Sequence, residues 1–246
     1  MRQWSDRHAG VGFDQLLILQ KSNCLQARYY YRIINADGKE VEQCGNGARC
    51  IAYYLFIIKK IQKNKICIRT KKRYLYLEHL HKNFMKIDMG RPLFSPCQLP
   101  FLYNDIKLYY SIKIDKKIYK ISIVSMGNPH CIIQIKDIND NLIQKIGYQL
   151  SIHSLFPEGV NVGFMQVISE KKIFLKVYER GVGETKSCGT GACAAVVTGI
   201  RNKLLCNTVD VFLSGGQLQV TWRGGLKDPV YMSGEATHVY DGVLKY

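Results

Sequence analysis

The sequence predicts an α/β (α+β) protein built from two related halves. A five-residue pattern, Cys-Gly-x-Gly-Ala, occurs at residues 44–48 and again at residues 188–192. Upstream of each copy, Val-Gly-Phe-Asp-Gln-Leu at residues 11–16 corresponds to Val-Gly-Phe-Met-Gln-Val at residues 162–167. A repeat constrains the whole fold, because each copy forms the same structural unit. We therefore expect two similar domains that face each other.

Each half also shows the same order of predicted elements. Strand-like segments rich in β-branched and aromatic residues lead through a tight turn into the cysteine motif, and an apolar helix follows. In the first half, Asp37-Gly38 predicts a hairpin turn between strands at residues 30–35 and 39–43. The helices after Cys44 and Cys188 are apolar nearly all round, which predicts that strands bury them.

The two cysteine motifs predict proton-transfer chemistry. A cysteine just before a helix lies near unpaired backbone N–H groups and the positive end of the helix dipole, which should lower its thiol pKa. The glycines allow a carboxylate to approach those N–H groups. Cys44 and Cys188 would supply an acid and a base on opposite faces of one carbon, as inversion of a stereocentre requires. This chemistry needs no metal and no cofactor.

A metal site is the alternative for these cysteines. Cys44 would then pair with Cys50, and Cys188 with Cys193. Zinc-binding pairs usually have two to four intervening residues, whereas Cys44 and Cys50 have five. On buried helices, we interpret Cys50 and Cys193 as small core residues instead.

Composition limits the cellular role. The net charge of +16 is typical of nucleic-acid-binding proteins, but many lysines between residues 59 and 120 alternate with Ile, Tyr and Asn in strand-like segments. We therefore expect no nucleic-acid partner. The longest apolar run, residues 50–58, is far shorter than the roughly 20 residues that span a bilayer. With no apolar signal near Met1, a cytoplasmic protein without membrane association is expected.

These motifs together resemble the diaminopimelate epimerase family. The resemblance rests on Gly12-Phe13-Asp14-Gln15, Asn35-Ala36-Asp37-Gly38, Gln43 to Cys50, Ser125-Met126-Gly127-Asn128-Pro129-His130, Tyr178-Glu179-Arg180-Gly181, Ser187 to Cys193, and Gly234 to Gly242. It extends from about His8 to the carboxyl end. It implies interconversion of LL-diaminopimelate and meso-diaminopimelate, which supplies lysine and peptidoglycan synthesis.

The resemblance also implies an architecture. Each domain would be a curved mixed β-sheet wrapped around a central helix, and the carboxyl-terminal segment would return to the first domain. We expect the first domain to comprise residues 1–88 and 235–246, and the second residues 89–234. Tyr240 resembles a residue at the family's dimer contact, which implies a homodimer.

The family's functional residues can be carried over by position. Cys44 and Cys188 match the acid–base pair, and His130 and Glu179 match the residues thought to tune the thiols. The matching substrate-binding positions are Gln15, Asn35, Gly45, Asn46, Asn128, Asn161, Glu179, Arg180, Gly189 and Thr190. Arg180 is the candidate for the distal carboxylate, because a guanidinium binds carboxylates well.

One family feature is missing. Family members begin with a strand that carries Gly-x-Gly-Asn-Asp-Phe, and nothing similar precedes Arg7. The internal repeat supports this expectation. Gln166 in the second half corresponds to Gln15 in the first, and Asn128 lies 38 residues before Gln166 (166 − 128). The first-half counterpart of Asn128 would therefore fall upstream of Met1. The expectation is a first domain without its amino-terminal strand.

Three alternative functions therefore stay open: an inactive remnant, a racemase for another amino acid and a basic binding protein. Arg180 and the predicted substrate-binding asparagines favour diaminopimelate over a smaller substrate such as proline.

Overall fold

The computed structural model describes residues 1–41 and 44–243. The chain forms two compact units: Met1–Ile87 with Gly234–Tyr246, and Asp88–Ser233. Strands β6 (Phe84–Gly90) and β15 (Val230–Glu235) contain the points where the chain passes from one unit to the other.

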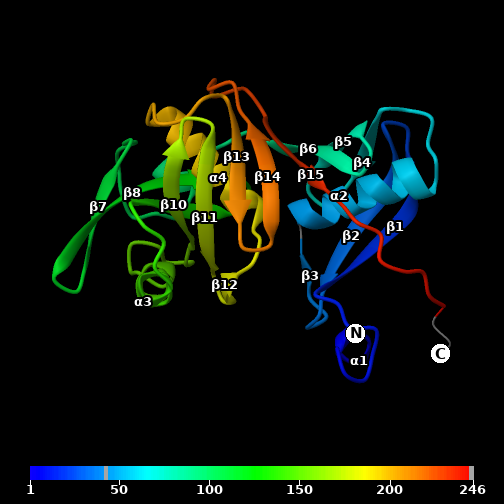
Figure 1. The fold of residues 1–246 in the computed structure, drawn as a ribbon, viewed down its shortest axis with the longest axis horizontal. Helices are drawn as coiled ribbons and strands as arrows, with labels where there is room; N and C mark the ends of the chain where they lie inside the picture. Colours follow the sequence, from blue (N-terminus) through cyan, green and yellow to red (C-terminus); the bar gives the residue numbers. More distant parts are fainter. Residues whose placement is uncertain (42–43, 244–246) are drawn as a thin grey trace. The chain divides into compact units, whose positions relative to one another are not determined.

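The first unit contains a mixed sheet and one main helix (Figure 1). Its strands follow the order β1–β2–β4–β5–β6, with β3 paired to β2. Among the described residues of this unit, β2 and β4 run parallel, and β1–β2, β2–β3, β4–β5 and β5–β6 are antiparallel. The elements are α1 (Arg2–Ser5), β1 (Gln15–Cys24), β2 (Ala27–Asn35), β3 (Glu40–Val41), α2 (Gly45–Tyr53), the π-helical turn η1 (Tyr54–Ile58), β4 (Lys65–Arg69) and β5 (Tyr74–His81).

The predicted hairpin at Asp37-Gly38 is confirmed. Strands β2 and β3 pair in antiparallel fashion, with Ile33 opposite Val41. Gly38 adopts φ +90°, a left-handed conformation that glycine takes without strain. The last two residues of the predicted strand, Glu42 and Gln43, lie outside the described residues.

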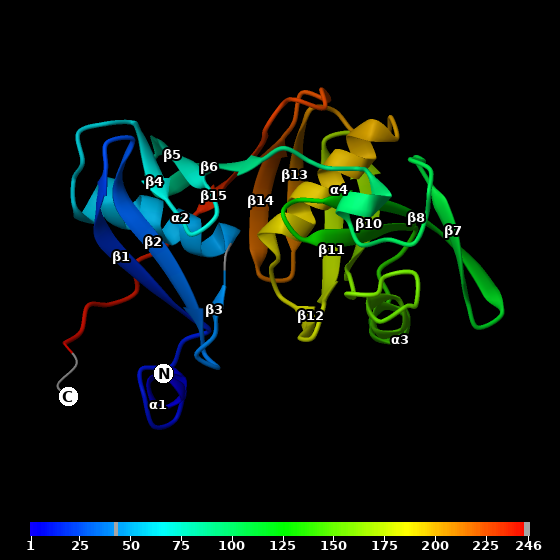
Figure 2. The same ribbon diagram turned by 180° about the vertical axis from the view of Figure 1, so that it is seen from behind.

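The second unit shows the predicted mixed sheet around a helix. Its strand order is β15–β14–β13–β11–β10–β9–β8–β7, with β12 beside β11. Two neighbouring pairs, β9 with β10 and β11 with β13, are parallel. Helix α4 contacts five of these strands, and Figures 1 and 2 show it lying along the sheet. The elements are η2 (Pro96–Gln98), β7 (Tyr110–Ile114), β8 (Lys117–Ser125), β9 (Pro129–Ile135), α3 (Asp140–Ser151), β10 (Asn161–Ser169), β11 (Lys172–Glu179), β12 (Gly183–Thr185), α4 (Gly189–Arg201), β13 (Thr208–Leu213) and β14 (Gly216–Thr221).

The two central helices differ in burial. In α4 the residues from Gly191 to Gly199 are all buried, as predicted. In contrast, Cys50 in α2 is exposed, and Tyr54 and Ile58 in the following turn are also exposed. The prediction that strands fully bury the first helix, with Cys50 in the core, is therefore wrong. The physical reason is the sheet: β10 lies between β9 and β11, whereas β1 pairs only with β2 among the described residues.

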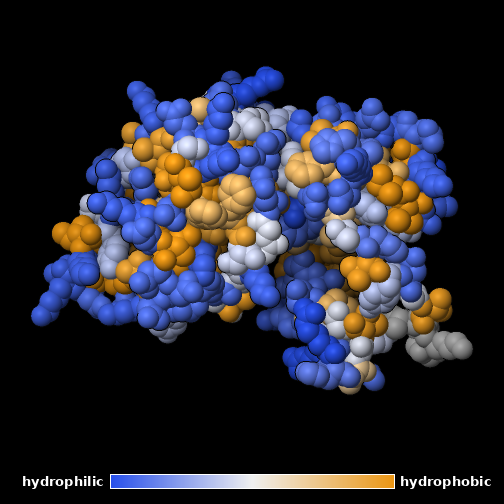
Figure 3. Space-filling model, in the orientation of Figure 1, coloured by the Kyte–Doolittle hydropathy of each residue, from blue (hydrophilic) through white to orange (hydrophobic). Residues whose placement is uncertain are grey.

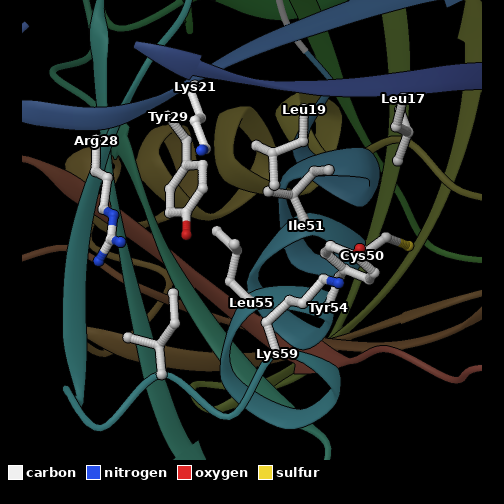
Figure 4. Close-up of a pocket in the computed structure, with 11 residues that line it drawn as sticks. Leu17, Leu19, Lys21, Arg28, Tyr29, Cys50, Ile51, Tyr54, Leu55 and Lys59 are labelled. Atoms are coloured by element: carbon white, nitrogen blue, oxygen red, sulfur yellow. The ribbon is translucent and has the colours of Figure 1, made fainter. Parts of the chain in front are cut away.

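A cavity of about 760 Å³ lies between β1 and the helical segment formed by α2 and η1 (Figure 4). Side chains from β1, including Leu17 and Leu19, form one wall, and Ile51 and Leu55 from the helical segment face them. Cys50 also lines this cavity. None of the residues predicted to act in catalysis or substrate binding is among its lining residues.

Hydrophilic side chains cover most of the face in Figure 3, with apolar side chains in scattered groups. Within residues 1–41 and 44–243, no helix is both long enough and apolar enough to cross a bilayer.

Candidate active site

Both predicted catalytic cysteines stand at a helix start. Cys44 is the N-cap residue of α2 and Cys188 is the N-cap residue of α4. Each has an extended backbone, with φ −144° and ψ 110° at Cys44 and φ −132° and ψ 105° at Cys188. The following residue in each case begins the helix. The predicted helix starts are confirmed, and each thiol lies beside the unpaired N–H groups of a first helical turn.

The Cys44 sulfur accepts a hydrogen bond from the first turn of α2. The donor is the backbone N–H of Gly47, at an N–Sγ distance of 3.2 Å. Burial is the largest influence on this thiol and raises its pKa above the usual value, while the N–H groups of Gly47 and Asn46 lower it. The expectation of a lowered thiol pKa is therefore wrong for this state, because the loss of hydration outweighs the helix amides.

Cys188 is more deeply buried and has no backbone N–H bonded to its sulfur as a cap. Burial raises its thiol pKa to about 12, and the negative charge of Glu179 acts in the same direction. The hydroxyl of Thr190 and the N–H of Gly191 act in the opposite direction. The expectation of a lowered thiol pKa is therefore wrong for Cys188 as well. A pKa raised in this way favours the protonated thiol at neutral pH.

Polar side chains from the β8–β9 turn, from β9 and from α4 connect to the Cys188 sulfur. Asn128, in the turn between β8 and β9, donates from Nδ2 to Thr190 Oγ1 at 3.3 Å. His130 Nε2 lies 3.2 Å from Asn128 Oδ1. Thr190 Oγ1 in turn lies 3.6 Å from the sulfur of Cys188. The four residues thus form one connected chain of hydrogen bonds.

Asn161 connects this turn to the end of β11. Its Nδ2 donates to the carbonyl oxygen of Pro129 at 3.0 Å, and its Oδ1 accepts from the backbone N–H of Arg180 at 3.1 Å. The guanidinium of Arg180 donates to the carbonyl oxygen of Glu158 at 2.6 Å. The predicted second-half residues are therefore gathered at one edge of the second unit, around the start of α4.

The other predicted binding and contact residues lie in the first unit. Gln15, at the start of β1, donates from Nε2 to Asn35 Oδ1 at 2.9 Å, at the end of β2. Gly45 and Asn46 form the first turn of α2. Tyr240 is 62% exposed in the carboxyl-terminal segment.

Two residues near the thiols were not identified from the sequence. Tyr31 is buried on β2, and its hydroxyl has no hydrogen-bond partner among the described residues. Burial and the neighbouring Cys44 raise its phenol pKa. Thr185 donates its hydroxyl to the carboxylate of Glu179. The sequence contained only a weak signal for Tyr31, which is its inward position in an alternating strand.

His130 gives this site a pH-dependent stability. It is completely buried, and burial followed by the charge of Arg180 lowers its pKa from 6.5 to about 3. Below pH 6.5 the unfolded chain binds a proton that folded His130 does not, so the free energy of unfolding falls as pH decreases toward 3. Chemical denaturation should show that the stability difference between the parent and His130→Gln shrinks by about 2 kcal/mol from pH 7.5 to 5.0. A difference that does not change with pH would contradict a neutral, buried His130.

Within the described part of the chain, no group of three or more His, Cys, Asp and Glu side chains is arranged to hold a metal ion.

Comparison with known proteins is consistent with this arrangement. The profile of the family described as diaminopimelate epimerase matches residues 1–94 and 122–239. The chain belongs to the diaminopimelate epimerase family. A diaminopimelate epimerase from Buchnera aphidicola (subsp. Acyrthosiphon pisum, strain 5A) is 48% identical over 244 residues, covering 99% of this chain and 86% of that protein. One from Acinetobacter baumannii is 46% identical over 246 residues, with the same coverage.

Solved structures share the fold of this family at low sequence identity. A probable proline racemase from Agrobacterium radiobacter K84 gives a TM-score of 0.68 at 12% identity, covering 98% of this chain and 80% of that one. A hydroxyproline epimerase from Agrobacterium vitis gives 0.69 at 14% identity, covering 95% and 76%. The predicted fold class is confirmed, and like other epimerases this family member is an isomerase.

Proposed function

We propose that the chain interconverts LL-diaminopimelate and meso-diaminopimelate by a two-base reaction in which Cys44 and Cys188 transfer the protons. The observation that carries this proposal is the repeated site: each compact unit presents one cysteine at the start of a glycine-rich helix. Membership of the diaminopimelate epimerase family supports the choice of substrate. The reaction would supply lysine and peptidoglycan precursors.

The proposed step moves two protons at one carbon. One cysteine, as a thiolate, removes the α-proton, and the other, as a thiol, donates a proton to the opposite face. The backbone N–H groups of Gly45 and Asn46, and of Gly189 and Thr190, bind the reacting carboxylate and stabilise the negative charge that develops. Because burial raises the pKa of the Cys188 thiol, this thiol holds a proton at neutral pH, as the acid of the reaction must. Microscopic reversibility then makes it the base in the other direction.

The remaining polar residues would bind the rest of the substrate. We assign the distal carboxylate to Arg180, because a guanidinium offers paired N–H donors to a carboxylate. Its present bonds are to backbone carbonyl oxygens, which substrate would replace in part. Gln15, Asn35, Asn128, Asn161 and Glu179 complete the proposed substrate contacts, and His130 and Glu179 are the proposed modulators of the thiols.

The proposal includes an organisation for the whole protein. The two epimerase domains would comprise residues 1–88 with 235–246, and residues 89–234. A homodimer would form with Tyr240 at its contact, where an exposed aromatic ring favours association. The reaction requires no cofactor in this scheme, and nucleic acid is not a proposed partner. A cytoplasmic location stays a prediction of the sequence.

A single assay separates this function from its alternatives. Purified protein is incubated separately with LL-diaminopimelate and L-proline, and the stereoisomers are resolved by chiral chromatography. We expect a mixture of the LL and meso isomers from diaminopimelate and unchanged proline. Racemised proline with unchanged diaminopimelate would indicate a related racemase. No conversion of either compound by folded protein would favour an inactive remnant.

A further inference from the structure

The chain of hydrogen bonds that leads to Cys188 has a defined direction, and this direction follows from His130 at its buried end. His130 is completely buried and uncharged, so one ring nitrogen carries a hydrogen and the other carries a lone pair. Its Nδ1 has no hydrogen-bond partner among the described residues, and its Nε2 faces the amide oxygen of Asn128. A buried N–H without a partner costs more than a buried lone pair without one. The hydrogen therefore lies on Nε2, and His130 donates to Asn128.

The hydrogen bond from His130 fixes the orientations of the Asn128 amide and the Thr190 hydroxyl. With Oδ1 of Asn128 accepting from His130, the amide presents Nδ2–H to Thr190 Oγ1. A hydroxyl has one hydrogen and can accept on its lone pairs. Because Thr190 Oγ1 accepts from Asn128, its own hydrogen remains for the Cys188 sulfur, 3.6 Å away.

We propose that Thr190 is a positioning residue whose hydroxyl donates to Cys188, and that His130 and Asn128 act on this cysteine through it. The inference rests on the proposed function, because it concerns the same cysteine, but it adds a role that substrate binding does not explain. In the direction in which Cys188 is the base, its thiolate forms in a buried site. A hydrogen bond to an ionised sulfur is stronger than one to a thiol, so the oriented hydroxyl favours the thiolate.

The test measures the thiol without substrate. The full chain is alkylated with iodoacetamide between pH 7 and 10.5, and modification of Cys188 is quantified by mass spectrometry of its peptide. Exposed Cys97 serves as the internal reference. Thr190→Val, which keeps the shape but loses the hydroxyl, should slow alkylation of Cys188 at pH 8 by about tenfold or more, since hydrogen bonds to charged groups are the strong ones. Thr190→Ser should stay within about threefold of the parent, because it keeps the donor.

A double-mutant comparison tests the connection to Asn128. Asn128→Ala alone should also slow alkylation of Cys188, but it should add little to Thr190→Val, because Asn128 acts on Cys188 through the hydroxyl that Thr190→Val removes. His130→Gln keeps an N–H donor and should resemble the parent more closely than His130→Leu does. Circular dichroism melting curves confirm that each variant is folded.

Two results would overturn the inference. Equal alkylation rates at Cys188 in the parent and in Thr190→Val would show that the hydroxyl does not act on the sulfur. Additive losses from Asn128→Ala and Thr190→Val would show that Asn128 acts independently of Thr190. Both readouts omit diaminopimelate, so failure of the proposed activity would leave them unchanged and would be recognised separately.

Discussion

Replacing either Cys44 or Cys188 by alanine should lower kcat for epimerisation by roughly 100- to 10,000-fold, the usual contribution of a positioned acid or base. Each thiol serves one face of the same carbon in the proposed reaction, so neither substitutes for the other. The helices should persist, because Cys44→Ala removes one capping hydrogen bond from α2, while the Cys188 side chain makes no capping bond to α4. Initial rates in both directions, with thermal melting of each variant, provide the measurement.

Two other cysteines give matched controls. Cys50 is exposed beside the cavity, so Cys50→Ala should leave both activity and stability close to the parent. Cys193 is completely buried in α4, so Cys193→Ala should lower the free energy of unfolding while leaving the catalytic thiols in place. Near-parent activity in Cys44→Ala or Cys188→Ala would contradict the assignment of two catalytic cysteines.

Gly47→Ala should be the second most damaging change, with a loss of activity of about 100-fold, comparable to misplacing a catalytic group. A Cβ atom at Gly47 would lie 2.4 Å from Tyr31 Oη, at the end of a rigid, buried ring. The first turn of α2 would then shift and weaken the bond from Gly47 N–H to the Cys44 sulfur. Kinetics at saturating substrate would report the loss.

The same geometry predicts a rescue. Tyr31→Phe removes the oxygen that blocks Gly47→Ala, and this oxygen has no hydrogen-bond partner among the described residues. The single variant Tyr31→Phe should therefore keep the parent's stability or exceed it slightly. The double variant should recover much of the lost activity, although the flexible end of Leu17 must also move. A double variant as inactive as Gly47→Ala would contradict the steric explanation.

Local patterns in the sequence predicted much of the fold. The helix starts at Cys44 and Cys188 follow from glycine-rich motifs whose signals lie within a few residues. The Asp37-Gly38 hairpin follows from turn chemistry. The burial of the first helix could not be predicted in this way. An apolar pattern around a helix indicates which residues are suited to a core, but Cys50 is exposed because, among the described residues, β1 has a neighbouring strand on one side only.

The electrostatics of the site were less predictable. Sequence position identified the helix N–H groups near each thiol, but the pKa of Cys188 depends mainly on how completely the fold removes it from water. Similarly, nothing in the spacing of Asn128, His130 and Thr190 indicates that their side chains form one chain of hydrogen bonds. That connection depends on the packing of α4 against β9, which is a long-range feature.

The most direct test of the two-base reaction is the fate of solvent deuterium during early turnover. LL-diaminopimelate is converted in D2O to a small extent, and mass spectrometry then measures deuterium at the α-carbon of both product and remaining substrate. The experiment is repeated from the meso isomer. Because one cysteine removes the proton and the other delivers a solvent-derived one, we expect deuterium in the product and almost none in the remaining substrate, in both directions. Equal deuterium in remaining substrate and product would contradict the account, since it would mean that a single group exchanges the proton on both faces.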